Sequence, residues 1–95
     1  MIKSLTRIAM STAALAVLIP AAAQAADPAF CAGYADAALN QVRAALSNPN
    51  CAGGARGARW TMERHIHFDW CLTVPAPTAA SEREARTEFL RGCRG

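Results

Sequence analysis

Apolar residues recur at steps of three and four positions between residue 30 and about residue 47. The set consists of Cys31, Tyr34 or Ala35, Ala38, Val42 and Leu46. This spacing is typical of an amphipathic helix, and the alanine-rich composition of the segment favours the same structure. Asn48-Pro49-Asn50 follows, and proline both lacks the next helical donor and disfavours a helical residue before it. We therefore expect a first helix that ends before residue 49.

The segment from residue 60 to residue 72 contains both tryptophans and both histidines of the chain. A helical period would place three of its residues, His67, Trp70 and Cys71, on one face with Val74. A strand is the alternative, because apolar residues also alternate with polar ones at Ile66, Phe68 and Trp70. We favour the helix, with Thr61 as its cap and Met62 as its first residue.

Two segments predict the connections between elements. Residues 51–57 contain three glycines, which favours a flexible connection or a turn with a positive φ. Pro75-Ala76-Pro77 predicts a stiff linker that ends the second element, because proline lacks a backbone donor.

A third helix is predicted by Ser81 and Glu84, which match the S-x-x-E capping box. We expect this helix to run toward Arg91. Glu82 and Arg86 are four residues apart, which favours an ion pair on the solvent-facing side. Two sets of residues can form its buried face, either Ala85, Phe89 and Cys93, or Arg86, Leu90 and Cys93. The fold class expected from these elements is mostly α, a small disulfide-stapled bundle of about three short helices.

Residues 1–25 have the three parts of a secretory signal peptide. Lys3 and Arg7 supply positive charge, an uncharged apolar stretch follows, and a small-x-small cleavage site ends at Ala25. The apolar stretch is shorter than the ~20 residues that a membrane-spanning helix needs. We expect cleavage after Ala25, which leaves one domain, residues 26–95, in the periplasm or outside the cell without a membrane anchor. An uncleaved N-terminal anchor is the alternative.

The expected mature domain contains four cysteines at near-even intervals: Cys31, Cys51, Cys71 and Cys93. In an exported domain of about 70 residues they predict disulfides, because a core of that size is marginal without a staple. Four cysteines allow three connectivities. If the three elements pack antiparallel, Cys31 and Cys71 lie at one end of the bundle and Cys51 and Cys93 lie at the other. We therefore predict the pairs Cys31 with Cys71 and Cys51 with Cys93, each worth roughly 4 kcal/mol.

Charge and spacing argue against several classes of function. The formal net charge is +3, and loss of Lys3 and Arg7 would leave about +1, so a nucleic-acid partner is not expected. No C-x2-C motif is present, and His65 and His67 would lie on separate faces of a helix. We expect neither a metal nor another cofactor, and metal binding through His65 and His67 is only the third alternative for function.

His67 and Cys71 are four residues apart and could be drawn as a base and a thiolate nucleophile. An exported cysteine that can form a disulfide usually does so, and the acidic residues between 82 and 88 fit a solvated helix face. We therefore expect that the protein is not an enzyme.

Short motifs along the domain resemble a small exported four-cysteine module of proteobacterial periplasmic proteins, which has no established activity. The motifs are Cys31-x2-Tyr34-Ala35-x2-Ala38-x2-Gln41, Arg59-Trp60, His67-x2-Trp70-Cys71, Glu84-Ala85-Arg86 and Leu90-x2-Cys93. The resemblance implies the architecture and the compartment, and it carries over no catalytic residue. The chain departs from the module after Cys51, where an aromatic residue is expected.

The function expected from the sequence is that of a non-enzymatic binding or interaction module. Trp60, His67 and Trp70 are the candidate contact residues, and burial of the large aromatics in the core is the alternative. The alternative function is an accessory subunit or inhibitor of a cell-envelope hydrolase. An unknown protein partner is compatible with both functions.

Overall fold

The structure is a computed structural model in which residues 24–94 are described. It contains four α-helices and one 3₁₀ helix: α2 (Pro28–Leu46), α3 (Pro49–Ala52), η2 (Ala58–Trp60), α4 (Arg64–Cys71) and α5 (Ala76–Arg94). No strand occurs in this part of the chain, apart from an isolated bridge between Ala25 and Pro75. The expected mostly α fold class is therefore confirmed, and the second predicted element is a helix. The predicted signal peptide falls mainly on residues 1–23, which lie outside the described range.

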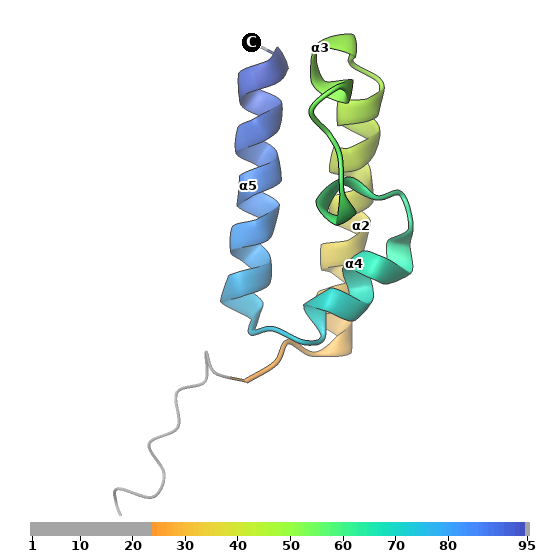
Figure 1. Ribbon diagram of the computed structural model, residues 1–95. Helices are drawn as coiled ribbons and strands as arrows, with labels where there is room; N and C mark the ends of the chain where they lie inside the picture. Colours follow the sequence, from red (N-terminus) through yellow and green to blue (C-terminus); the bar gives the residue numbers. More distant parts are fainter. Residues whose placement is uncertain (1–23, 95) are drawn as a thin grey trace, which may run out of the picture.

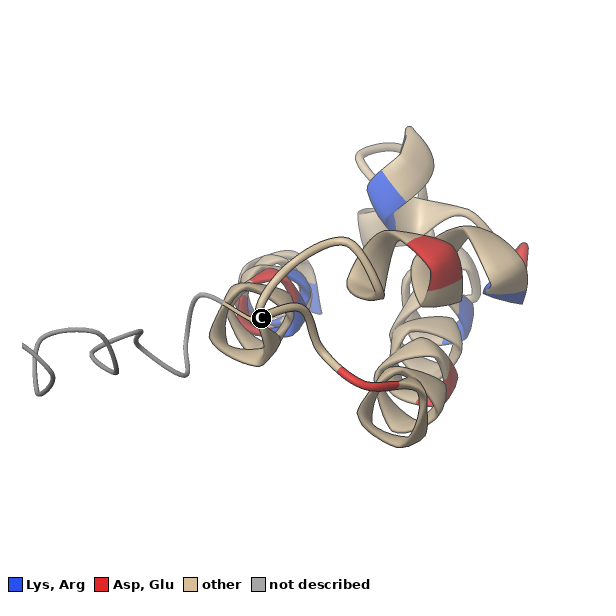
Figure 2. Cartoon of the chain, turned by 90° about the horizontal axis from the view of Figure 1, so that it is seen from below, with Lys and Arg blue, Asp and Glu red and all other residues tan. Residues whose placement is uncertain are grey.

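The long helices α2 and α5 lie side by side and point in the same direction, and the chain returns between them through η2 and α4 (Figure 1). Seen from below, α2, α5 and the segment that contains α4 occupy three corners of the molecule (Figure 2). Acidic and basic residues occur on both α2 and α5 in this view. This up, down, up path brings the start of α2 to the end of α4, and α3 to the end of α5.

Two disulfides fasten the opposite ends of this arrangement. Cys31 in the first turn of α2 is bonded to Cys71 at the end of α4, with the Cα atoms 5.6 Å apart. Cys51 in α3 is bonded to Cys93 near the end of α5, with the Cα atoms 5.2 Å apart. This is the connectivity predicted from the sequence, because the return path has the direction that the prediction assumed.

Helix α2 begins and ends where its local chemistry dictates. Asp27 caps it by accepting a hydrogen bond from the Phe30 backbone at 2.8 Å, and Pro28 occupies a first-turn position that needs no donor. Six residues on one face are buried, namely Cys31, Tyr34, Ala35, Ala38, Val42 and Ala45. The prediction that Leu46 lies on this face is wrong. Leu46 is 47 % exposed, because its position follows that of the buried Ala45.

The predicted starts of the two later helices are both wrong. The Thr61 hydroxyl accepts a hydrogen bond from the Glu63 backbone at 3.1 Å, and α4 begins only at Arg64. Helix α5 begins at Ala76, five residues before the predicted cap at Ser81. Its first turn contains Pro77, which is tolerated because the first backbone N–H groups of a helix have no partner within the helix.

The prediction that Glu82 and Arg86 pair on the solvent-facing side of the helix is also wrong. Arg86 is completely buried, and it shares the buried face of α5 with Ala79 and Leu90. The second of the two expected buried faces of this helix, with Arg86 and Leu90, is therefore the one that forms.

The core consists of two clusters, each next to one disulfide. The first cluster contains Val42, Ala45, Cys51, Ala55, Trp60 and Leu90. The second cluster contains Ala26, Cys31, Tyr34, Cys71 and Ala79. Over residues 24–94, no helix has the length and apolar character that crossing a membrane requires. Along α5, Arg86 lies between Ala79 of the second cluster and Leu90 of the first cluster.

Candidate functional site

A hollow of about 270 Å³ opens where α2, α4 and α5 meet the η2 segment. We call it the α4 hollow, and its lining consists of Tyr34, Ala58, Arg59, Ile66, His67, Trp70, Glu82 and Arg86. It combines aromatic walls with two guanidinium groups, one carboxylate and one imidazole. Such a mixture of apolar surface and a few convergent polar groups is characteristic of binding sites for small molecules or side chains.

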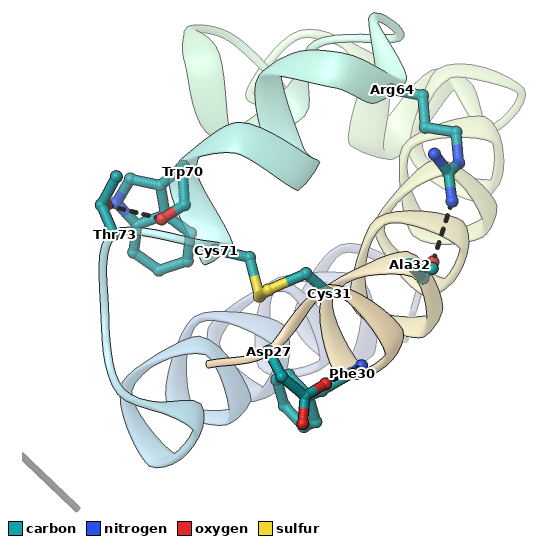
Figure 3. Close-up of a disulfide and its surroundings, with 8 residues drawn as sticks. All are labelled: Asp27, Phe30, Cys31, Ala32, Arg64, Trp70, Cys71 and Thr73. Carbon is teal, nitrogen blue, oxygen red and sulfur yellow. Dashed lines mark hydrogen bonds between the residues drawn. A yellow bond between two sulfur atoms is a disulfide. The ribbon is translucent and has the colours of Figure 1, made fainter. Parts of the chain in front are cut away.

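Helix α4 is held against α2 at both of its ends (Figure 3). The disulfide fixes its last residue, Cys71, to Cys31. At its first residue, Arg64 reaches back to α2, where Nη2 donates to the Ala32 carbonyl at 3.2 Å and Nε donates to the Asp36 carboxylate at 2.8 Å. The helix has only eight residues, so these attachments set the position of every side chain that it contributes to the hollow.

His67 lies in the wall of the hollow with only 4 % of its surface exposed. Its Nε2 lies 2.7 Å from the Thr61 carbonyl oxygen. A carbonyl only accepts, so Nε2 carries the hydrogen and donates it. Burial lowers the pKa of His67 below its ordinary value, and the positive charge of Arg86 acts in the same direction. The imidazole is therefore neutral at neutral pH and ties the η2–α4 connection to α4.

Arg86 is a completely buried guanidinium in a domain that supplies few partners for it. Its Nε donates to the Gln41 side-chain oxygen at 2.8 Å, and Nη1 donates to the Arg59 carbonyl at 3.4 Å. The guanidinium carbon lies 5.2 Å from the centre of the Tyr34 ring, within the range of a cation–π contact. The third nitrogen, Nη2, has no hydrogen-bond partner among the described residues.

Gln41 fixes the orientation of Arg86. The Gln41 amide nitrogen donates to the Arg83 carbonyl at 3.1 Å and to the Thr87 hydroxyl at 2.9 Å. These two bonds assign the amide nitrogen, so the amide oxygen faces Arg86 and accepts from its Nε. Helix α2 thus holds the guanidinium of α5 through the Gln41 amide and the Tyr34 ring.

The charges that line the hollow do not balance. Glu82 pairs with Arg59 through two hydrogen bonds, and its carboxylate raises the pKa of Arg59. The same carboxylate lies 3.9 Å from Nη1 of Arg86. Because His67 is neutral, two guanidinium groups face one carboxylate, and the lining carries an excess of one positive charge at neutral pH.

An aromatic wall faces these charged groups. The rings of Tyr34 and Trp70 are 5.7 Å apart at their centres and tilted by 40°, a geometry in the favourable range for aromatic pairs. Trp70 is half-buried and Ile66 is 37 % exposed. The hollow therefore offers apolar contact area beside its buried cation.

The structure separates the three contact residues that the sequence suggests. His67 and Trp70 both line the hollow. Trp60 does not, since it is 7 % exposed and packs on Phe89 in the first core cluster, with ring centres 4.9 Å apart. Core packing therefore describes Trp60, while Trp70 is accessible at the hollow.

The two histidines do not come together. The His65 side chain is 64 % exposed, and its nearest carboxylate, that of Glu63, is 3.9 Å away. Among residues 24–94 there is no group of three or more His, Cys, Asp and Glu side chains placed to hold a metal ion.

The sequence alone did not indicate that Arg86, Gln41 and Tyr34 belong to one site. Periodicity alone assigns Arg86 to either of two faces, and a long polar side chain is normally exposed. A signal was nevertheless present, because the short motifs quoted above include all three residues. Their occurrence in these motifs, at positions far apart in the sequence, was the available indication that the three residues meet in space.

Comparison with protein-family models, with curated proteins and with solved structures finds no match to this chain.

Proposed function

We propose that this protein is a non-enzymatic binding module, located in the periplasm or secreted, and that it binds through the α4 hollow. The observation that carries the proposal is the buried guanidinium of Arg86, which lies beside an aromatic wall and whose Nη2 has no hydrogen-bond partner within residues 24–94. A buried polar group without a partner is costly in a folded protein. A ligand group that completes its hydrogen bonds would offset that cost.

The proposed compartment is supported by the two disulfides, which are compatible with an extracytoplasmic protein. A binding role, as opposed to catalysis, is supported by the state of the candidate reactive groups. Cys71 is in a disulfide, so its sulfur is not a nucleophile. Nε2 of His67 is occupied by the Thr61 carbonyl.

The two tryptophans permit a direct test, since Trp70 lines the hollow and Trp60 lies in the core. In a Trp60→Phe variant, Trp70 is the sole source of tryptophan fluorescence. In the matched Trp70→Phe variant, only the core residue emits. Each purified variant is mixed with the soluble fraction of the native cell envelope, which ultrafiltration has separated into small molecules and macromolecules.

We expect the emission of Trp70 to change with one of the two fractions, while the emission of Trp60 stays constant. The responding fraction also tells whether the ligand is a small molecule or a macromolecule. If neither fraction changes the emission of Trp70, the proposal fails.

A further inference from the structure

We propose that the group that enters the α4 hollow is a carboxylate attached to an apolar moiety, and that Nη2 of Arg86 receives it. This inference rests on the proposed function, since it names the chemistry of the ligand for the same hollow. Three features of the hollow support it, namely the hydrogen bonds of Arg86, the charges of the lining and the shape of the walls.

Two of the three guanidinium nitrogens of Arg86 already donate hydrogen bonds. Nε donates to Gln41 and Nη1 to the Arg59 carbonyl, whereas the two N–H groups of Nη2 have no partner in the described part of the chain. Arginine has no acceptor, so only an acceptor can complete it. A carboxylate oxygen is the strongest common acceptor for a guanidinium N–H group. Gln41 and Tyr34 already fix the orientation of the guanidinium.

The charged groups of the lining indicate the sign and the magnitude of the ligand's charge. The lining holds Arg59 and Arg86 against Glu82 alone, and the imidazole of His67 is neutral at neutral pH. One anionic group restores neutrality, while a dianion would leave an unpaired negative charge beside Glu82. The lining therefore favours a monoanion, and a neutral ligand would leave the excess charge uncompensated.

The apolar residues and the volume of the hollow limit the shape and the size of the rest of the ligand. Tyr34, Ile66 and Trp70 supply apolar contact, and the volume of about 270 Å³ lies below the ~300 Å³ at which sites for drug-sized ligands begin. A short aliphatic or monoaromatic acid fits these limits. The C-terminal carboxylate of a chain that ends in an apolar residue presents the same chemistry, so the ligand is either a free acid or such a terminus.

The test compares an acid with its uncharged analogue of the same shape. The Trp60→Phe variant of the full mature protein is titrated with 3-phenylpropanoate and with 3-phenylpropanamide at neutral pH, and Trp70 emission is recorded. We expect a saturable change with the acid and at least about tenfold weaker binding of the amide, because a single unpaired charged donor discriminates on that scale. Equal binding of the two compounds, or no binding of either, would overturn the inference.

A pair of charge variants that leaves the Arg86 side chain itself in place tests the role of the guanidinium. Glu82→Gln removes the carboxylate that competes for Arg86, and Glu88→Gln makes the same change on the exposed part of α5, where Glu88 pairs with Arg91. We expect the first to tighten binding of 3-phenylpropanoate about five- to tenfold, as removal of one nearby like charge predicts. The second leaves binding unchanged. If both variants change the affinity equally, the ligand is responding to net charge and not to the hollow.

A direct variant, Arg86→Lys, lacks the Nη2 position, and we expect it to bind the acid at least about tenfold more weakly. Its folding is checked by circular dichroism, and the Glu82→Gln result stands on its own if Arg86→Lys does not fold. A peptide that ends in Phe with a free carboxylate, compared with its C-terminal amide, distinguishes the two sources. Binding of the free-carboxylate peptide indicates a chain terminus, and binding of 3-phenylpropanoate without the peptide indicates a free acid.

The outcome separates this inference from the proposed function. If Trp70 responds to the envelope fraction and not to the acid, the hollow is a binding site for different chemistry and only this inference fails. If Trp70 responds to neither, both proposals fail.

Discussion

The two disulfides form a matched pair for testing what positions the α4 hollow. Each is removed in turn, by Cys31→Ala with Cys71→Ala or by Cys51→Ala with Cys93→Ala. Alanine is preferred to serine because three of these cysteines are completely buried, and a buried serine hydroxyl would need a partner.

The structure predicts nearly equal losses of stability for the two double variants. The bonded cysteines are separated by 40 and 42 residues. In the chain-entropy account each bond then contributes about 4 kcal/mol, with a difference of less than ~0.1 kcal/mol between them. A loss of that size is a large part of the ~5–15 kcal/mol that stabilises an ordinary domain. The two variants should therefore have similar urea midpoints, both well below that of the parent.

The variants should differ at the hollow. The Cys31–Cys71 bond fixes the end of α4, one residue after Trp70, whereas the Cys51–Cys93 bond joins α3 to α5 at the other end of the molecule. In the Trp60→Phe background, we expect the emission of Trp70 to move to longer wavelength when the first bond is removed. Amide hydrogen exchange in α4 should also rise in that variant, because the helix then loses its covalent attachment to α2 and keeps the Arg64 hydrogen bonds and the Tyr34–Trp70 contact.

The assay is urea unfolding followed by far-ultraviolet circular dichroism, together with Trp70 emission at urea concentrations where each variant remains folded. Sucrose is added to all samples if a variant is unfolded in buffer, since it favours the compact state equally. A difference in stability loss above about 2 kcal/mol would refute the entropic reasoning. Unchanged Trp70 emission after loss of Cys31–Cys71 would refute the role of that bond at the hollow.

Two further predictions concern His67 and Gly57. Burial lowers the pKa of His67, so the stability that its neutral form contributes is complete above the unfolded-state pKa near 6.5 and is lost as the pH falls below that value. His67→Gln should lose less stability than the parent between about pH 7.5 and 5.5 in urea unfolding, and an equal loss in both proteins would contradict the shift. Gly57 has a φ of +86° with open space around it, so Gly57→Ala should cost about 1–3 kcal/mol through backbone strain alone. Gly33→Ala, in the interior of α2 with equally open space, should instead stabilise the protein by up to about 1 kcal/mol, and a loss at Gly33 would show that space and not φ decides the effect.

Helix α2 shows what periodic patterning predicts well. Its apolar residues repeat over five turns, and the cap at Asp27 and the proline at position 49 bound it closely. The start of α5 shows where patterning fails. A capping box at Ser81 is a local preference, and the chain can satisfy the first turn of the helix earlier, since the Pro75 carbonyl accepts from Thr78 and Ala79. Local signals decide a helix end only where no equally good alternative lies nearby.

The candidate site was predictable only in part. His67 and Trp70 occur in the aromatic segment that the sequence marks as unusual, and helical spacing brings them to the same region of α4. Arg86 is different, because the periodicity places it on only one of two possible buried faces and does not predict complete burial of its guanidinium. Its partner Gln41 lies 45 residues away in the sequence.

The sequence by itself predicted the mostly helical fold class and, on the assumption that the three elements pack antiparallel, the pairing of the cysteines. These follow from local periodicity and from the short connections, which leave few ways to arrange three elements. Only the tertiary structure decided that Trp60 belongs to the core, that Trp70 and Arg86 line one hollow and that Nη2 of Arg86 has no partner among the described residues. The reason is physical: burial and hydrogen-bond completion of a long side chain depend on groups supplied by other helices, and no local pattern contains them.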